Sequence, residues 1–389
     1  MPNETPYAGP LTPSPEQLPS IIALLNRVFY ANKTFEVTDE FPLLFCPSGL
    51  HQLRILTTNS QPVAHVATVI EEISAFGCRL CVACLGAVCT DEPHRGRGLA
   101  GRLVDDAISR AASAGAAVML ISGHRPLYTR RGAHKAGIFH QFTIPADSLP
   151  RQGDLTVAEI SPEQCPQALE LYQSEPLYFC RSLQRYTSQT STGLVMSRQG
   201  KTYLIRRGPD PLAVLTVWYS RSNSGDGEKS VATVEFAGSR PAILAALPVI
   251  CREYQATGAE IISYAHDQAL LGACRDLGIE PELVPFDFSV RLLDAQRLWG
   301  DFQPLLAERL NGDMLSDISL HPQADELEIH TLTFRTPGEE FTVQGSQQIL
   351  AALFGSTELD PLAQAPGQLG QALRQAFPLP LPQYGLNFL

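Results

Sequence analysis

A short segment in the first quarter of the chain joins two arginines to three small residues. It reads Arg95-Gly96-Arg97-Gly98-Leu99-Ala100 and follows an apolar run that ends near Thr90. The residues after it repeat apolar positions at helical spacing, so we expect a strand, a loop and a helix that begins near Gly98. Backbone N–H groups at a helix start attract anions, and glycines let a phosphate approach the backbone closely. The segment therefore predicts a pyrophosphate site; the alternative is a glycine-rich turn that holds no ligand.

Two common phosphate-binding motifs do not fit this segment. No Lys-Ser/Thr pair follows the glycines, and no acidic residue stands at the distance that a dinucleotide fold requires. The segment fits Arg/Gln-x-x-Gly-x-Gly/Ala instead, here Arg95-x-x-Gly98-x-Ala100, and so resembles the acetyl-CoA loop of the GNAT N-acetyltransferases. Downstream, Leu127-Tyr128-x-x-x-Gly132 resembles the Tyr-x-x-x-Gly element that follows the fifth strand in that family.

The resemblance implies that acetyl-CoA is the co-substrate and assigns roles to particular residues. Backbone amides from Arg95 to Ala100 would hold the pyrophosphate, and the strand end at Val88 and Thr90 would contact the pantetheine arm. Tyr128 would be the general acid that protonates the departing CoA thiolate. A phenol suits this role because its acidity is comparable to that of the thiol that forms. The alternative is that Tyr128 is an ordinary half-buried tyrosine.

The acceptor amine must lose a proton before it attacks the thioester, and the sequence offers no single obvious base. Four titratable residues lie on or beside the strands that precede the loop: His51, His65, Glu71 and Glu72. Each could accept a proton, and each could equally be a solvated strand residue without a catalytic role.

The chain contains an internal repeat. The segment Ser14-Pro15-Glu16-Gln17-Leu18-Pro19 recurs 147 residues later, as 161 − 14 = 147, in the form Ser161-Pro162-Glu163-Gln164-Cys165-Pro166. Serine, proline and glutamine in this order predict a helix start with a capping box. Two glycine pairs recur at similar offsets, Gly115 with Gly258 and Gly132 with Gly278, and we expect helix C-caps there. The offsets indicate two structural copies.

A third, smaller part follows the two copies. Linker-type residues lie between Pro145 and Asp154, and a second break is expected near residues 299–316. Beyond it, an alternating strand over Leu327–Phe334 and a helix over Gln347–Phe354 predict an α+β domain with an extended tail. The fold class is therefore α/β. We expect domains at 1–150, 151–297 and 298–389.

Two GNAT-like copies followed by a small α+β domain resemble the Eis-like acetyltransferases, whose third part is sterol-carrier-protein-like. The apolar ending Pro380–Leu389 resembles the tails of that group. This resemblance implies that the carboxylate of Leu389 is the base or the amine anchor, although a frayed terminus is the alternative. It also implies an acceptor side lined by Phe29, Tyr30 and Glu36, for which core aromatics and a solvated acidic loop are the alternative. It further implies assembly into a homo-oligomer.

The second copy departs from the family pattern where its loop should lie. The segment Val231–Ala242 has one glycine and no Arg-x-x-Gly-x-Ala, and Pro241 removes a backbone donor. We therefore expect only the first copy to bind CoA.

Composition narrows the class of protein further. The chain has 389 residues and a net charge of 29 − 40 = −11, which argues against a nucleic-acid partner. No apolar run approaches membrane-spanning length, and the N-terminus does not resemble a signal peptide. Nine dispersed cysteines favour a cytoplasmic location with reduced thiols. The spacing of Cys78, Cys81, Cys84 and Cys89 suggests a metal, but a buried strand pattern explains it better, and we expect no metal.

The function expected from these features is acetyl transfer from acetyl-CoA to a primary amine by direct attack in a ternary complex. A small, polycationic, aminoglycoside-like molecule is the expected acceptor. The alternatives are an acetyltransferase acting on a protein lysine or a metabolite amine, and a non-catalytic acyl-CoA sensor.

Overall fold

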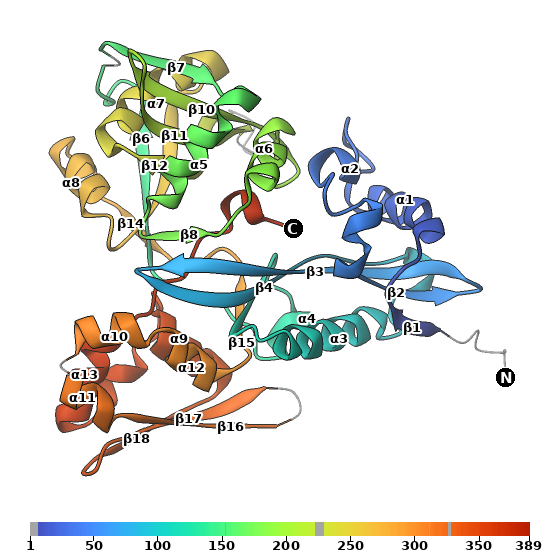
Figure 1. Cartoon of the computed structure of the whole chain (residues 1–389), viewed down its shortest axis with the longest axis vertical. Coiled ribbons are helices and arrows are strands. Elements are labelled where there is room, and N and C mark those ends of the chain that lie inside the picture. Colours follow the sequence, from blue (N-terminus) through green and yellow to red (C-terminus); the bar gives the residue numbers. More distant parts are fainter. Residues whose placement is uncertain (1–6, 152, 222–228, 311, 326–327) are drawn as a thin grey trace. The chain divides into compact units, whose positions relative to one another are not determined.

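The computed structural model describes residues 7–151, 153–221, 229–310, 312–325 and 328–389 (Figure 1). The chain divides into two compact units. The first comprises Met1–Gly137, Asp287–Leu381 and Phe388–Leu389, and the second comprises Ile138–Phe286 and Pro382–Asn387. Each unit is built around a mixed sheet with helices, so the predicted α/β class is confirmed.

The sheet of the first unit runs in the order β1-β2-β3-β4-β5-β15. Neighbouring strands are antiparallel except for β4 and β5, which are parallel. The strands are β1 (Ala8–Leu11), β2 (Leu53–Thr58), β3 (Gln61–Ala75), β4 (Cys78–Thr90), β5 (Val118–Ile121) and β15 (Ser289–Leu292). The predicted strand end at Thr90 is thus confirmed.

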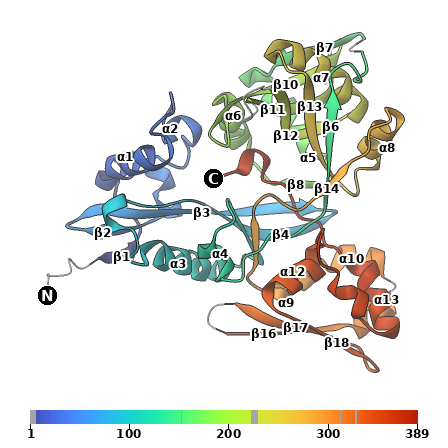
Figure 2. The same ribbon diagram turned by 180° about the vertical axis from the view of Figure 1, so that it is seen from behind.

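Helices cover both faces of this sheet (Figures 1 and 2), with α3 and α4 on one face and α1 on the other. These helices and turns are η1 (Pro15–Gln17), α1 (Leu18–Phe29), α2 (Val37–Glu40), η2 (Pro47–Gln52), η3 (Glu92–His94), α3 (Leu99–Ser113) and α4 (Pro126–Thr129). Leu99, Leu103 and Ala107 are buried at helical spacing on α3 and pack into the core under the sheet. Gly98 caps the start of α3, as the sequence predicts.

The sheet of the second unit runs in the order β14-β6-β13-β12-β11-β10-β7. Its strands are β6 (Phe139–Pro145), β7 (Leu155–Glu159), β10 (Arg198–Arg207), β11 (Asp210–Arg221), β12 (Lys229–Gly238), β13 (Gly258–Tyr264) and β14 (Glu282–Val284), and the short strand β9 (Leu194–Val195) pairs with β10. The short strand β8 (Leu177–Phe179) is not part of this sheet. Its helices are η4 (Pro162–Gln164), α5 (Cys165–Gln173), α6 (Leu183–Ser191), α7 (Arg240–Tyr254) and α8 (Gln268–Asp276). As in the first unit, one central pair of strands, β12 and β13, is parallel.

The helix starts of the two copies have the same geometry. Ser14 and Ser161 are both extended N-caps with complete capping boxes, and a short 3-10 turn leads into α1 and α5 respectively. Gly132 and Gly278 both have φ of 72° and follow α4 and α8, as predicted. The prediction for Gly258 is wrong, because this residue begins β13 and Gln255 caps α7. A Cβ at Gly258 would lie 2.7 Å from the carbonyl oxygen of Ile144, so close strand approach explains this glycine.

The two copies exchange their final strands. β6 is the last strand of the first copy in sequence but pairs with β13 of the second sheet. β15 is the last strand of the second copy and pairs with β5 of the first sheet. The units therefore divide at 137/138 and 286/287, whereas the sequence-based boundaries were set at 150/151 and 297/298, because the sequence does not reveal which edge a strand joins.

The C-terminal part belongs to the first unit by its contacts. It contains α9 (Ala295–Asp301), α10 (Gln303–Arg309), α11 (Gly312–Asp317), β16 (Ser319–Ala324), β17 (Ile329–Arg335), β18 (Glu340–Gln344), α12 (Ser346–Phe354), η5 (Pro361–Gln364) and α13 (Gly367–Ala376). The last short helix, η6 (Gly385–Asn387), belongs to the second unit. Helices α9 to α11 lie in the region of the predicted break at 299–316. The predicted strand and helix correspond to β17 and α12; Leu327 lies outside the described residues.

Candidate active site

The loop before α3 presents a row of free backbone donors. Gly96 and Gly98 have φ of 75° and 74°, a conformation that glycine adopts without strain. Among the described residues, the N–H groups of residues 96–101 have no hydrogen-bond acceptor. The loop is exposed, and a Cβ on either glycine would contact nothing within 4 Å. Free amides at a helix start, with open space beside them, suit the diphosphate of a nucleotide-type ligand.

The strand that leads into the loop separates from its neighbour. β4 pairs with β5 only from Val82 to Leu85, and its last five residues continue to Thr90 without a β5 partner. On the β3 side, pairing shifts register between His65 and Ala67, so β4 carries a bulge there. Ala87 has φ of 50°, a left-handed conformation that is uncommon for alanine. The split exposes strand backbone to a ligand arm, and Val88 and Thr90 are half-buried along it.

The two loop arginines differ in their contacts. Arg95 donates from Nε to the carbonyl oxygen of Thr90 at 3.2 Å, which links the loop to the end of β4. The Arg97 guanidinium lies 6.0 Å from the ring centre of Tyr7, whose hydroxyl is 2.9 Å from His94 Nδ1. Both arginines are exposed and can reach an anion on the loop.

Tyr128 lies on α4, close to the separated strands. Its side chain is buried in the core that contains Leu99 and Ile121. Burial raises the pKa of Tyr128, and Arg125 opposes this shift. The hydroxyl has no hydrogen-bond partner among the described residues. Tyr128 therefore holds a proton across the neutral range and can donate it to a nearby anion.

The carboxyl end of the chain lies against β4. Leu389 is buried, and a Cβ at Gly86 would lie 2.3 Å from its carbonyl oxygen. Only glycine leaves room for this contact. Gly86 is the first residue of β4 beyond its last pair with β5, Leu85 with Ile121. The carboxyl group thus lies where the strand split begins. Sequence reasoning missed Gly86, although an isolated glycine in an apolar strand was a signal of close backbone approach.

The four candidate bases lie in different environments. His65 is fully buried on β3, and its Nδ1 lies 2.9 Å from the carbonyl oxygen of Ala87. Burial lowers the pKa of His65 to about 4, so the ring is neutral at pH 7. Glu71 is also buried, so neither residue is the solvated strand side chain of the alternative interpretation. Glu72 pairs with Arg79 at the surface, and His51 is exposed in η2.

Of the three residues expected on the acceptor side, two lie in one pocket and the third does not. Tyr30 and Glu36 line an open pocket after α1, together with Asp39 and two cations, Arg27 and Lys33. The Tyr30 hydroxyl donates to buried Glu40 at 2.6 Å. Glu36 is exposed and caps α2. Phe29 is exposed, but it does not line this pocket.

The cysteines of β4 do not form a reactive or metal-binding group. Burial raises the pKa of the Cys89 thiol to about 12, which makes it a poor nucleophile at neutral pH. Within the described ranges, no three His, Cys, Asp or Glu side chains are placed to hold a metal ion.

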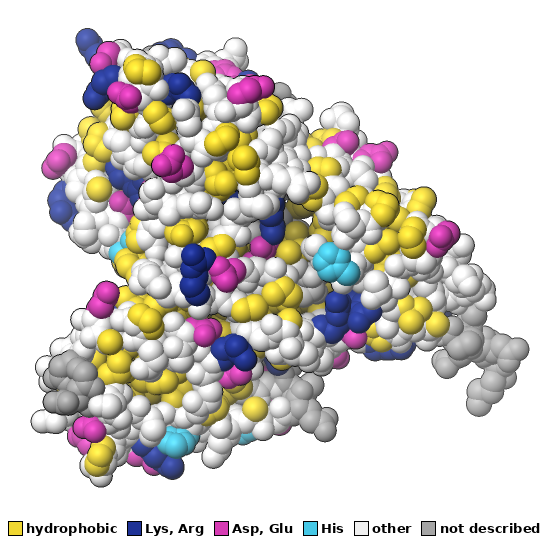
Figure 3. Space-filling model, in the orientation of Figure 1, with side chains coloured by type: hydrophobic (Ala, Val, Ile, Leu, Met, Phe, Trp, Pro, Cys, Tyr) yellow, Lys and Arg dark blue, Asp and Glu magenta, His cyan; other side chains and the backbone are white. Residues whose placement is uncertain are grey.

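None of the described helices is long and apolar enough to cross a membrane. Lys and Arg side chains are scattered over the face seen in Figure 3 and form no stripe.

Comparison with known proteins identifies the part of the chain that carries this site. Residues 12–136 match the family model described as an acetyltransferase (GNAT) domain. The first domain belongs to the GNAT acetyltransferases. The matched residues include the amide-rich loop and Tyr128, and the GNAT fold generally uses acetyl-CoA. No curated protein matches the chain significantly.

Solved structures share the fold over nearly the whole chain. A GCN5-related N-acetyltransferase from Anabaena variabilis is 16% identical with a TM-score of 0.63, and the match covers 97% of this chain and 98% of that one. One from Kribbella flavida is 15% identical with a TM-score of 0.62 and 96% coverage of both chains. Eis1 from Mycobacterium abscessus is 14% identical with a TM-score of 0.61, covering 97% of this chain and 98% of that one. The predicted Eis-like arrangement is thereby confirmed at the level of the fold.

Proposed function

We propose that the chain transfers an acetyl group from acetyl-CoA to a primary amine of a small polycationic molecule, by direct attack in a ternary complex. The observation that carries the proposal is the row of free amides at residues 96–101, next to the split between β4 and β5. A diphosphate fits the amides, and an extended thioester arm fits the split. Arg95, Gly96, Arg97, Gly98, Leu99 and Ala100 would hold the diphosphate, and Val88 and Thr90 would contact the arm.

Proton transfer would divide between two groups of the first unit. The Leu389 carboxyl group lies at the start of the split and would anchor the ammonium group of the acceptor and accept its proton. Attack of the free amine on the thioester carbonyl would form a tetrahedral oxyanion, which backbone N–H groups of β4 would stabilise. As the C–S bond breaks, Tyr128 would give its proton to the thiolate, and the phenolate would regain a proton from the new amide nitrogen. The buried Cys89 thiol takes no covalent part.

The preference for a polycationic acceptor rests on charge. Glu36 and Asp39 bring two carboxylates to the open pocket after α1, and Arg27 is already paired with Asp91 at 2.9 Å. The net charge of −11 favours the approach of a cation at low salt. The similarity to Eis1 supports the shared fold only and is not an argument for the acceptor class.

The decisive experiment measures free-thiol release from acetyl-CoA by the purified protein. The acceptors are aminoglycosides, polyamines, amino acids and lysine peptides, and a blank without acceptor is the control. We expect turnover with the polycationic acceptors and only background release in the blank. Turnover with lysine peptides alone would replace the proposed acceptor class. Tight acetyl-CoA binding without release on any amine would support the acyl-CoA sensor instead.

Two further features of the Eis-like resemblance are part of the proposal. The C-terminal part, with the three-stranded sheet β16-β17-β18 and its helices, would be the sterol-carrier-like domain. The protein would also form a homo-oligomer, which light scattering coupled to gel filtration can test.

A further inference from the structure

The second unit repeats the strand split of the first. β12 pairs in parallel with β13 only at three positions, from Ser230 with Gly258 to Ala232 with Glu260. Beyond these pairs the two strands continue apart to Gly238 and Tyr264. In the first unit the corresponding split is the proposed acetyl-CoA site.

The chain's own tail contacts both arms of this split. The backbone N–H of Gln383 donates to the Tyr264 hydroxyl on β13 at 2.8 Å. The N–H of Leu386 donates to Glu235 on β12 at 3.3 Å. The Gln189 side chain donates to the carbonyl oxygen of Leu386 at 2.5 Å. Tail residues 382, 383 and 385 line the pocket between these strands. The tail therefore lies where a ligand arm would bind in an intact copy.

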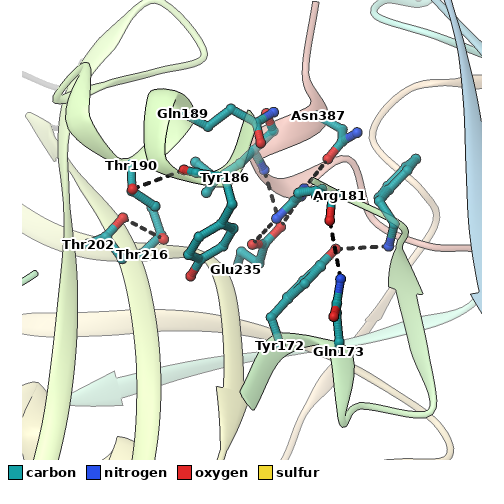
Figure 4. Close-up of polar contacts among 12 residues, drawn as sticks. Tyr172, Gln173, Arg181, Tyr186, Gln189, Thr190, Thr202, Thr216, Glu235 and Asn387 are labelled. Atoms are coloured by element: carbon teal, nitrogen blue, oxygen red, sulfur yellow. Dashed lines mark hydrogen bonds and ion pairs between the residues drawn. The ribbon is translucent and has the colours of Figure 1, made fainter. Parts of the chain in front are cut away.

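A buried arginine fixes the end of this tail segment (Figure 4). Arg181 donates from both terminal nitrogens to Glu235 at 2.6 Å each, and from Nε to the Asn387 side-chain oxygen at 2.6 Å. Its guanidinium also lies 4.3 Å from the ring centre of Tyr172. Arg181 and Asn387 are both almost completely buried. The Arg181 guanidinium donates to three oxygens, two of Glu235 and one of Asn387, and this arrangement holds Asn387 in one orientation.

In the second copy, a side chain of the protein itself also occupies the position that corresponds to the anion site of the first copy. Glu175 accepts hydrogen bonds at 2.8 Å from the Gly238 N–H and from Arg240, the first residue of α7. Arg240 also pairs with Asp267 at 2.7 Å. A protein carboxylate therefore occupies the strand-to-helix turn where the first copy offers free amides. This arrangement explains why the sequence of the second copy lacks the loop.

We propose that the second GNAT-like copy is a receptor for the chain's own C-terminal tail, with Arg181, Glu235 and Asn387 as positioning residues for Leu389. Residues 382–387 are bound in the second unit. Only Phe388, whose ring lies 5.6 Å from that of Phe288, precedes Leu389 at Gly86. A tail fixed two residues before its end loses most of the freedom that a terminus has. The proposal rests on the proposed catalytic role of Leu389.

The experiment compares the full-length protein with Asn387→Ala, which removes the acceptor of Arg181 Nε. Carboxypeptidase release of Leu389 reports how tightly the tail is held, and thiol release reports kcat and the KM for acetyl-CoA. We expect Asn387→Ala to release Leu389 about tenfold faster and to lower kcat by a similar factor, with an unchanged acetyl-CoA KM. Asn387→Asp keeps an acceptor for Arg181 and should restore both values.

A second tail variant and a matched control accompany this pair. A Cβ at Gly385 would lie 2.2 Å from Glu235 Oε2, so Gly385→Ala should give the same result as Asn387→Ala by a different route. Glu253→Gln alters a contact with Lys201 in the same unit, away from the tail, and should change neither value.

The outcomes separate this inference from the proposed function. Unchanged release of Leu389 in both tail variants overturns the receptor role, whatever the activity. Faster release with an unchanged kcat overturns the positioning role. An absence of acetyl transfer by the unaltered protein would refute the proposed function alone, because the carboxypeptidase measurement needs no acceptor.

Discussion

Burial keeps two residues beside the strand split neutral, by pKa shifts in opposite directions. It keeps Tyr128 protonated and therefore able to donate, and it keeps His65 neutral and therefore unable to act as a cation. The sequence identified both residues as candidates by type and position. It could not reveal their burial, because burial depends on the packing of α4 and β3 against distant segments.

Replacement of Tyr128 by Phe tests the general-acid role. We expect kcat to fall about 100-fold, because a positioned acid typically contributes that much or more, with little change in acetyl-CoA affinity. The raised pKa of Tyr128 means that the phenol loses its proton only above its ordinary value near 10. The alkaline fall of kcat should therefore lie above pH 10 in the unaltered protein and disappear in Tyr128→Phe. A variant with unchanged turnover would remove Tyr128 from this role.

His65 makes stability depend on pH. Its folded pKa of about 4 lies below the unfolded value of 6.5, so between these values the unfolded chain binds a proton that the folded chain does not. Stability therefore rises with pH across this window and falls as the solution is acidified. At pH 5 the cost to the folded state is about 2 kcal/mol relative to pH 8. Urea unfolding at both pH values should show this difference in the unaltered protein and not in His65→Asn. Equal pH dependence in the two proteins would contradict the assignment.

At the scale of elements, β4 performs three tasks along its length. Its first part pairs with β5, its middle part lies against Leu389 at Gly86, and its end leads into the amide-rich loop. The strand, loop and helix were predictable because apolar spacing and the Arg-x-x-Gly-x-Ala pattern are local signals. The bulge at Ala87 and the contact of Leu389 were not, because they depend on residues far away in the sequence.

Gly86→Ala tests the contact between β4 and Leu389. The added Cβ would lie far closer to the Leu389 carbonyl oxygen than packed atoms allow, so the end of the tail must move. We expect kcat to fall at least tenfold, with acetyl-CoA binding changed by less than about threefold. Gly272→Ala is the matched control, because a Cβ in that position of α8 meets nothing within 4 Å. Thiol release and calorimetric binding of acetyl-CoA provide the two readouts; equal kcat in both variants would exclude Leu389 from catalysis.

At the scale of the whole molecule, the exchange of final strands makes neither copy complete on its own. The first sheet ends with β15, which is the last strand of the second copy in the sequence, and β6 of the first copy pairs with β13. The repeat itself was readable from matching helix starts. The exchange was not, because the apolar residues of a strand do not specify which sheet edge it joins.

A fragment of residues 1–150 tests this exchange. It contains every motif of the first domain, but it lacks β15 and leaves Phe139, Phe142 and Ile144 of β6 without β13. We expect it to show no cooperative thermal unfolding by circular dichroism and no acetyl-CoA binding, whereas the full chain shows both. Cooperative unfolding of the fragment would show that β6 can complete the first sheet.

The same exchange delays completion of the first sheet during protein synthesis. The edge of β5 that β15 covers is made 168 residues before the strand that covers it, as 289 − 121 = 168. At about 5–20 residues per second, a ribosome needs roughly 10–30 s to span that distance. Throughout this interval the nascent chain carries an open, apolar sheet edge, which is the kind of surface that pairs with other chains. Slow translation should therefore increase the demand of this protein for chaperones.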